Sequence, residues 1–347
     1  MSKARSVVAA TILFTVVWGL GVSMPAQATF EGTNGRIAFR QYFNDAHTYG
    51  AIFTIDPDGT GLRQITHPRK GVLHDKPDWS PNGRWIAFQR VGNVCTSSEC
   101  PRDRLFKVRA DGSNVTLIER GLGCRPSYCP GDYEPAWSPS GKWIAFSRDT
   151  GGGAIVGLFM MRTNGTHTRQ VTEKIEPTKY EDSAPQWSPD GTRLVFQRFN
   201  KVTGLFAVFT VRIDGTHDRR LTPWNLGAGG NPDWSPDGRW ILFQSHFEDG
   251  EPRDVCVVHP NGTALHCLTH ATDTTSFLRA GFSPDGTMIT TAMVPGVGAA
   301  GNADVFVMDA DGTDLRDVTN TVRWDSTSDW GSMPKADVRS STRRWKR

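Results

Sequence analysis

Trp187-Ser188-Pro189-Asp190-Gly191 is the stretch that decides the fold of this 347-residue chain, because the same pattern returns throughout the sequence. Further copies begin at Trp79, Trp137 and Trp234, a fifth copy begins at Phe282, and a shortened sixth copy is Asp329-Trp330-Gly331-Ser332. The steps between the leading aromatic residues are 58, 50, 47, 48 and 48 residues. Repeats of this length are typical of propeller blades or solenoid turns.

Each repeat predicts four short strands. In the copy headed by Trp187, the Pro and Gly residues predict a tight turn, and residues 193–198 alternate as a half-buried strand does. A second apolar segment, residues 207–212, leads through the hairpin signal Asp214-Gly215 to a polar outer strand at residues 219–222. Four short antiparallel strands are the content of one propeller blade.

The two ends of the repeat region complete each other. The N-terminal part contains strand patterns at residues 36–39, 52–55 and 62–66, without the aromatic strand that precedes them in the other repeats. That strand pattern stands instead around residues 328–330. We therefore predict an all-β, six-bladed β-propeller of four-stranded antiparallel blades over residues 29–334. Pairing of the N-terminal strands with a C-terminal strand closes the ring and removes its free sheet edges.

The segments outside the repeats have different compositions. Residues 1–28 contain Lys3 and Arg5, an apolar stretch at residues 7–22 and the ending Ala26-Gln27-Ala28, which predicts a cleaved signal peptide and no transmembrane segment afterwards. An uncleaved anchor is the alternative, although a span needs about 20 apolar residues. Residues 335–347 form a basic tail, which we predict to be disordered.

Charge is distributed unevenly along the chain. The total is +3, the signal carries two positive charges and the tail a net five, so the repeat region has a net charge of −4. A domain that binds nucleic acid concentrates positive charge on its fold. We therefore expect no nucleic-acid partner.

The six cysteines predict disulfides, because an exported chain enters an oxidising compartment. Cys256 and Cys267 stand symmetrically about Asn261-Gly262, so a hairpin that turns there places them opposite each other. The other four cysteines pair either locally or crosswise, and zinc binding is the alternative for them. They are Cys95, Cys100, Cys124 and Cys129.

The composite pattern P-x-W-S-P-D-G-x-x-I-x-F, followed by V-x-D-G-T-x-x-R-x-L-T, resembles the β-propeller repeats of the TolB family, which are exported proteins of the bacterial cell envelope. The resemblance covers about residues 30–334. It implies an exported propeller that binds a partner in the envelope. Blade sequence begins within ten residues of the predicted cleavage site, so we expect the propeller part of TolB without its α/β domain.

No known catalytic motif occurs in the sequence. The pattern G-x-S-x-G of α/β-hydrolases is absent, as are H-E-x-x-H and the Walker loop. We therefore predict a protein that is not an enzyme, with no catalytic residue and no cofactor.

Aspartates precede the leading aromatic residue in several repeats, and innermost propeller strands line the ring axis. We expect these side chains to gather at one mouth of the channel, where they would contact a basic peptide or a divalent metal such as calcium. Alternatively, they brace the entry into the innermost strand by accepting backbone N–H groups. They are Asp75, Asp78, Asp132, Asp182, Asp233, Asp325 and Asp329.

Together these observations predict a monomeric, secreted or periplasmic scaffold that binds an envelope protein or polymer. The longest predicted loops share the channel mouth with the aspartates, and loops on a rigid scaffold often carry binding function. These loops are residues 91–104, 121–134, 173–184, 247–253 and 295–303. The alternative is a lyase or hydrolase that acts on a polysaccharide or peptide at the acidic mouth.

Overall fold

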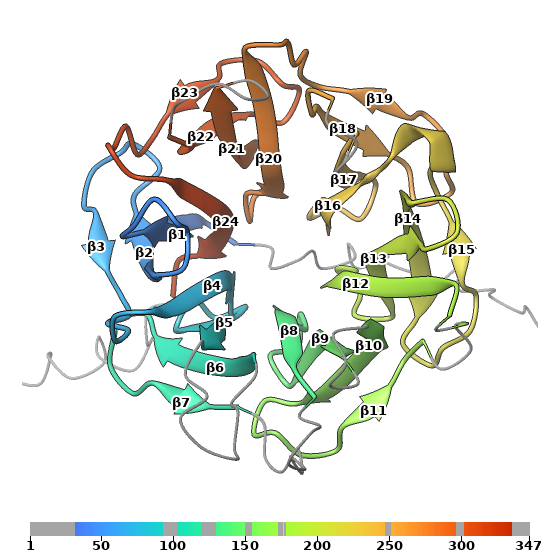
Figure 1. Cartoon of the computed structure of the whole chain (residues 1–347), viewed down its shortest axis with the longest axis horizontal. Coiled ribbons are helices and arrows are strands. Elements are labelled where there is room, and N and C mark those ends of the chain that lie inside the picture. The colour runs from blue at the N-terminus through green and yellow to red at the C-terminus, as the bar shows by residue number, and fades with distance from the viewer. Residues whose placement is uncertain are drawn as a thin grey trace, which may run out of the picture.

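The strands of the protein form a closed ring, as Figure 1 shows. The computed structural model describes residues 32–92, 103–118, 130–149, 155–172, 176, 178–246, 251–295 and 302–334. The predicted signal peptide, the basic tail and part of each predicted long loop lie outside these residues. So do Cys95, Cys100, Cys124 and Cys129, and the pairing of these cysteines stays a prediction.

The first three blades run from an innermost strand at the ring axis to a short outer strand. Blade 1 contains β24 (Asp325–Ser332), β1 (Asn34–Tyr42), β2 (Gly50–Ile55) and β3 (Arg63–Gln64). Blade 2 contains β4 (Val72–Trp79), β5 (Trp85–Gly92), β6 (Arg104–Arg109) and β7 (Thr116–Leu117). Blade 3 contains β8 (Asp132–Trp137), β9 (Trp143–Asp149), β10 (Ile155–Arg162) and β11 (Arg169–Gln170).

The other three blades repeat this arrangement. Blade 4 contains β12 (Tyr180–Trp187), β13 (Arg193–Asn200), β14 (Leu205–Arg212) and β15 (Arg219–Arg220), and a short 3-10 helix, η1 (Trp224–Leu226), follows it. Blade 5 contains β16 (Gly229–Trp234), β17 (Ile241–Gln244), β18 (Val255–Val258) and β19 (His266–Cys267). Blade 6 contains β20 (Thr275–Phe282), β21 (Met288–Pro295), β22 (Asp304–Asp309) and β23 (Arg316–Asp317). The predicted propeller of four-stranded antiparallel blades is confirmed.

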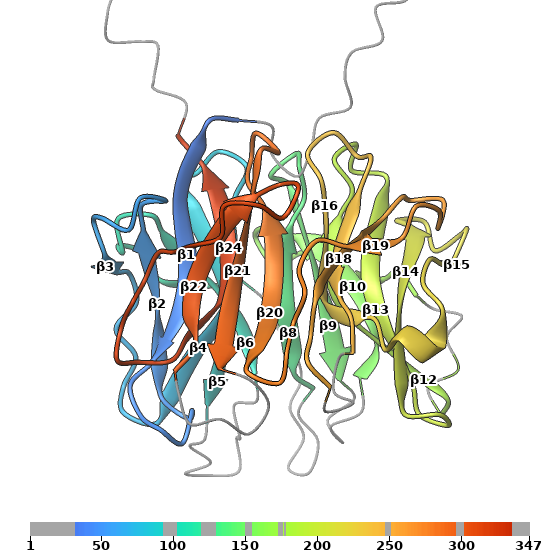
Figure 2. The ribbon, with the colours of Figure 1, turned by 90° about the horizontal axis from the view of Figure 1, so that it is seen from above.

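Blade 1 closes the ring by joining the two ends of the repeat region. Strand β24 pairs antiparallel with β1, with Trp330 opposite Ile37, and Figure 2 shows the two strands side by side. The indole N–H of Trp330 also donates a hydrogen bond of 3.1 Å to the carbonyl of Gly35, 295 residues away in sequence. The predicted closure is therefore confirmed.

The hydrophobic core lies between neighbouring blades. Trp187 and Phe196 of blade 4 pack against Leu158 and Met160 of blade 3, and all four side chains are buried. Equivalent clusters occupy the other junctions between blades. Full burial of one such side chain contributes roughly 1.5–3 kcal/mol. The leading aromatic residue of each repeat therefore holds one blade against the next.

The polar residues of the repeat form the turn after the innermost strand. Ser188 Oγ accepts the N–H of Arg193 at 2.9 Å and donates to Asp190 Oδ1 at 2.6 Å. Gly191 has a φ of 67°, which glycine adopts at little cost. The recurring Ser, Asp and Gly residues are thus needed for one turn geometry.

The two outer strands of blade 5 are joined by a disulfide. In β18 and β19, Cys256 lies directly opposite Cys267, and the two form a disulfide, as the spacing about the hairpin predicted. No helix in the described part of the chain is long and apolar enough to cross a membrane.

Candidate functional site in the central channel

A bulge recurs in all six innermost strands, where the pairing with the second strand changes register. Three residues before the leading aromatic, a residue other than glycine has a positive φ, between 42° and 64°. Such a backbone costs roughly 1–2 kcal/mol per residue, and bulges serve to re-aim a side chain. The six residues are Lys76, Glu134, Ala184, Asn231, Arg279 and Thr327.

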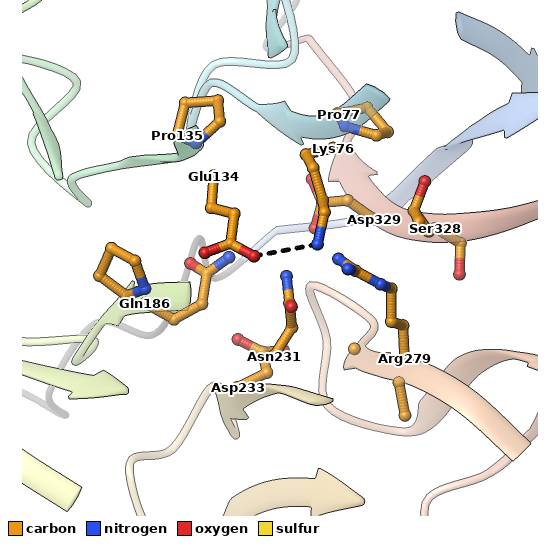
Figure 3. A pocket seen from close by; sticks show the side chains of 14 residues that line it. Lys76, Pro77, Glu134, Pro135, Gln186, Asn231, Asp233, Arg279, Ser328 and Asp329 are labelled. Atoms are coloured by element: carbon orange, nitrogen blue, oxygen red, sulfur yellow. Dashed lines mark hydrogen bonds and ion pairs between the residues drawn. The ribbon is translucent and has the colours of Figure 1, made fainter. Parts of the chain in front are cut away.

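These bulges surround a small polar cavity of about 40 Å³, lined by residues of all six innermost strands. Figure 3 shows the side chains of Lys76, Glu134, Asn231 and Arg279 pointing toward its centre. The channel is therefore a site to which every blade contributes.

Glu134 connects three blades at this site. Its Oε1 forms an ion pair of 3.0 Å with Lys76 Nζ of blade 2. Its Oε2 accepts the backbone N–H of Ala184 in blade 4 at 2.7 Å and the hydroxyl of Ser147 at 3.2 Å. Both carboxylate oxygens of Glu134 are thus engaged by the protein itself.

Three of the predicted aspartates form a second set, which we call the interblade aspartates: Asp78, Asp233 and Asp329. Each directly precedes the leading aromatic of its own blade and accepts the backbone N–H of the leading aromatic in the next blade. Asp78 accepts from Trp137 at 2.7 Å, Asp233 from Phe282 at 2.9 Å and Asp329 from Trp79 at 2.6 Å. These carboxyl groups therefore connect neighbouring blades at the channel wall.

Burial raises the pKa values of the interblade aspartates, so these carboxyl groups are weaker acids than usual. It raises the pKa of Asp233 to about 7 and that of Asp329 to about 6. Burial and the neighbouring Asp329 carboxylate together raise the pKa of Asp78 well above its ordinary value. The three groups lie close enough to influence one another's charge, so the channel wall carries less negative charge at neutral pH than its composition indicates.

The aspartates five residues before the leading aromatic pair within their own blade, and we call Asp132, Asp182 and Asp325 the cross-strand aspartates. Asp132 and Asp182 lie directly opposite Arg148 and Arg198 of the second strand and form two-pronged ion pairs with them. Both carboxyl groups are fully buried. They brace the start of the innermost strand, away from the cavity lining.

Asp325 lacks this arginine. It lies opposite Gln41 and accepts the hydroxyl of Thr321 at 2.9 Å. Because Asp325 is buried, its pKa is raised to about 7. Blade 2 has His74 at the same position, opposite Arg90, and burial lowers the pKa of His74 to about 3.

Asp75, the seventh predicted aspartate, pairs between blades. Its carboxylate contacts the Arg40 guanidinium of blade 1 at 2.8 Å and accepts the hydroxyl of Thr327 at 3.1 Å. Burial opposes ionisation, but Arg40 and Lys76 outweigh it and lower the pKa of Asp75. Asp75 is therefore a buried anion with its own counter-ion.

The structure thus brings together only the interblade aspartates around the channel, while the other four form separate contacts. A role for any of them in ligand contact stays a prediction. Sequence reasoning did not identify Lys76, Glu134, Asn231 or Arg279 as channel residues. The available signal was their shared position, three residues before the repeated aromatic.

The described residues do not present an evident metal centre. In that part of the chain, no three His, Cys, Asp or Glu side chains lie close enough to hold a metal ion together. The interblade carboxyl groups are each engaged with backbone N–H groups of the protein.

The fold and its polar channel define the class of protein, a six-bladed β-propeller whose innermost strands build a common central site. Residues 135–294 match the family model described as the TolB beta propeller domain. The chain therefore carries a TolB-like β-propeller, and the resemblance seen in its repeats is confirmed.

Individual proteins with a similar sequence or a similar structure were also found. A stretch of 95 residues is 35% identical to the "Uncharacterized protein Atu1656" of Agrobacterium fabrum, and it covers only 27% of each protein. TolB from Acinetobacter baumannii superimposes with a TM-score of 0.63 at 20% identity, over 86% of this chain and 67% of that one. Hydrazine synthase of Kuenenia stuttgartiensis gives 0.66 at 12% identity, over 89% and 49%. The two structures establish a shared fold alone.

Proposed function

We propose that this chain is an exported, non-enzymatic β-propeller of the bacterial cell envelope, which binds an envelope protein or polymer. The partner would engage the face on which the innermost strands begin and would reach into the channel. The observation that carries this proposal is the convergence of side chains from all six blades on one polar cavity. Such a shared site is typical of a rigid scaffold that recognises a ligand.

The chemistry of the cavity supports binding over catalysis. Among its described lining residues there is no His, Cys or Tyr. The Ser328 hydroxyl accepts a hydrogen bond of 3.0 Å from Thr290 Oγ1. A nucleophilic serine needs a general base beside it, and a threonine hydroxyl is not one. The carboxyl groups of Glu134, Asp233 and Asp329 already hold hydrogen bonds within the fold.

Export and an envelope location are supported by three independent features. The signal-like residues 1–28 predict passage across a membrane. The Cys256–Cys267 disulfide is suited to an oxidising compartment. Residues 135–294 match the TolB beta propeller domain, and the resemblance of the repeats to the TolB family implies an envelope protein.

A crosslinking capture from the native envelope fraction tests this proposal, with mass spectrometry as the readout. The test variant replaces residues 96–99 by Gly and Ser and keeps Cys95 and Cys100, which alters the predicted loop at residues 91–104. The control variant is Asp311→Ser, in a hairpin turn at the opposite ends of the strands. We expect a partner that the loop variant loses and the control retains. Capture that both variants retain would contradict the assigned face.

A further inference from the structure

The channel cavity has an imbalance between hydrogen-bond donors and acceptors. Its acceptors are engaged. Glu134 forms an ion pair with Lys76 and accepts a hydrogen bond from the N–H of Ala184. Asp233 accepts hydrogen bonds from the N–H groups of Trp234 and Phe282. Asp329 likewise receives backbone N–H groups of two tryptophans. Each carboxylate that lines the cavity therefore already accepts hydrogen bonds from the protein, and the number of free acceptors is smaller than the number of carboxylates.

The donors, in contrast, have spare capacity. Among the described residues, the guanidinium of Arg279 has no ion-pair or hydrogen-bond partner, although it presents five N–H donors. The side-chain amide of Asn231 likewise has no partner there, and Lys76 uses a single N–H on Glu134. Figure 3 shows the nitrogen-bearing ends of Lys76, Asn231 and Arg279 converging on the same space.

Two cations that converge in a partly enclosed channel repel each other unless an anion lies between them. Glu134 forms an ion pair with Lys76 at 3.0 Å, whereas Arg279 forms no ion pair among the described residues. The bulge at Arg279 has a φ of 42°, so the fold holds this side chain toward the channel at a cost in backbone energy. A ligand that supplies acceptor oxygens and negative charge would satisfy all three donors.

The size of the cavity narrows the class of anion. A water needs roughly 10–15 Å³, so a volume of about 40 Å³ holds about three water-sized groups. A carboxylate has three heavy atoms, and an arginine fork matches its two oxygens. A Glu or Asp side chain, or a chain terminus, brings such a group on a thin stem, whereas the ring of a uronic acid exceeds this volume.

We propose that the channel binds a carboxylate of a peptide segment of the partner, with Arg279 as the two-pronged donor and Asn231 and Lys76 as further donors. This inference rests on the proposed binding function and adds the chemistry of the ligand. It differs from the expectation of a basic ligand at an acidic mouth, because the interblade carboxyl groups are used within the fold.

The test compares two blocked tripeptides, N-acetyl-Gly-Glu-Gly-amide and N-acetyl-Gly-Gln-Gly-amide, by calorimetric or NMR titration of the folded chain. A charge-assisted hydrogen bond predicts binding of the Glu peptide that is about tenfold tighter or more. Arg279→Gln should remove this preference, and Asn231→Ala should reduce it. Arg239→Gln, a change at a highly exposed arginine outside the cavity lining, should leave it unchanged.

Several results would overturn the proposal. Equal binding of the two peptides, or a preference that survives in both Arg279→Gln and Asn231→Ala, would exclude the assigned donors. Preferential binding of galacturonate over galactose, without a peptide preference, would assign the site to an acidic sugar. If the envelope capture still yields a partner in these cases, the proposed function stands and only the carboxylate site fails.

Discussion

The interblade and the cross-strand aspartates stand at fixed positions of the innermost strands, one and five residues before the leading aromatic, yet their environments differ in kind. Asp182 is buried against the Arg198 guanidinium, which supplies a full positive charge. Asp78 is buried against the Trp137 N–H, which supplies only a dipole, and another carboxyl group lies nearby. Burial raises the pKa of both carboxyl groups, but Arg198 opposes the rise at Asp182, whereas the Asp329 carboxylate adds to it at Asp78. The comparison teaches that the partner from another strand sets how strongly burial disfavours the charged form.

Removing a cross-strand carboxylate should have the largest effect on stability. Asp182→Ala leaves the buried Arg198 without its two-pronged partner, and we expect a loss of about 3–5 kcal/mol in the free energy of unfolding. Chemical denaturation measures this loss. The matched control is Asp218→Ala, which removes an exposed partner of the same arginine and should cost about 0–1 kcal/mol. Equal losses in the two variants would contradict the distinction.

Removing an interblade carboxyl group should have an intermediate effect. Asp78→Ala leaves the buried N–H of Trp137 without an acceptor, which costs about 1–3 kcal/mol. Asp78→Asn keeps an acceptor oxygen and should cost less than about 1 kcal/mol, because the raised pKa favours an uncharged group there. Thermal and chemical unfolding of both variants check this order. A large loss in Asp78→Asn would show that the charge of Asp78 is needed.

The pH dependence of stability tests the raised pKa values that occur in both sets. Asp325 and Asp233 have folded pKa values of about 7, above the unfolded value, so the folded state binds more protons between about pH 4 and pH 7. Stability should therefore fall as the pH rises through this window, by up to about 1.4 kcal/mol per pH unit for each group. Asp325→Asn should remove one such contribution from a series of denaturation curves. An unchanged slope would contradict the raised pKa.

The smallest expected effect comes from giving Asp325 the opposite arginine that the other two cross-strand aspartates have. Gln41→Arg places an arginine opposite Asp325, as Arg148 stands opposite Asp132. The new charge should lower the pKa of Asp325 and raise the stability at pH 8 by about 1 kcal/mol, with little gain at pH 5. Unfolding at both pH values measures this difference. A gain of the same size at pH 5 would indicate better packing instead.

Local signals made the fold predictable from the sequence. Turn residues such as Ser188 and Gly191 form contacts within a few residues of themselves, so their repetition reveals the blades directly. The disulfide was predictable for the same reason, since Cys256 and Cys267 flank one hairpin.

The channel site was less predictable, because its contacts join residues of different blades. Asp78 was identified, but its partner Trp137 is 59 residues away, and the only signal for Arg279 was its position three residues before Phe282. The cross-strand pairs did leave a signal, since Asp132 and Arg148, like Asp182 and Arg198, stand 16 residues apart. That offset reflects the length of one hairpin.

The pairing of β24 with β1 also has a consequence for the order of folding. Five blades consist of consecutive residues, so each can pair its own strands as soon as its stretch of chain is available. Blade 1 must instead bring together segments almost 300 residues apart, and such distant contacts are slow to form. The chain would therefore reach its native state only in a final step, in which the two ends meet. A variant with a weakened β1–β24 contact should accumulate as an open intermediate during refolding.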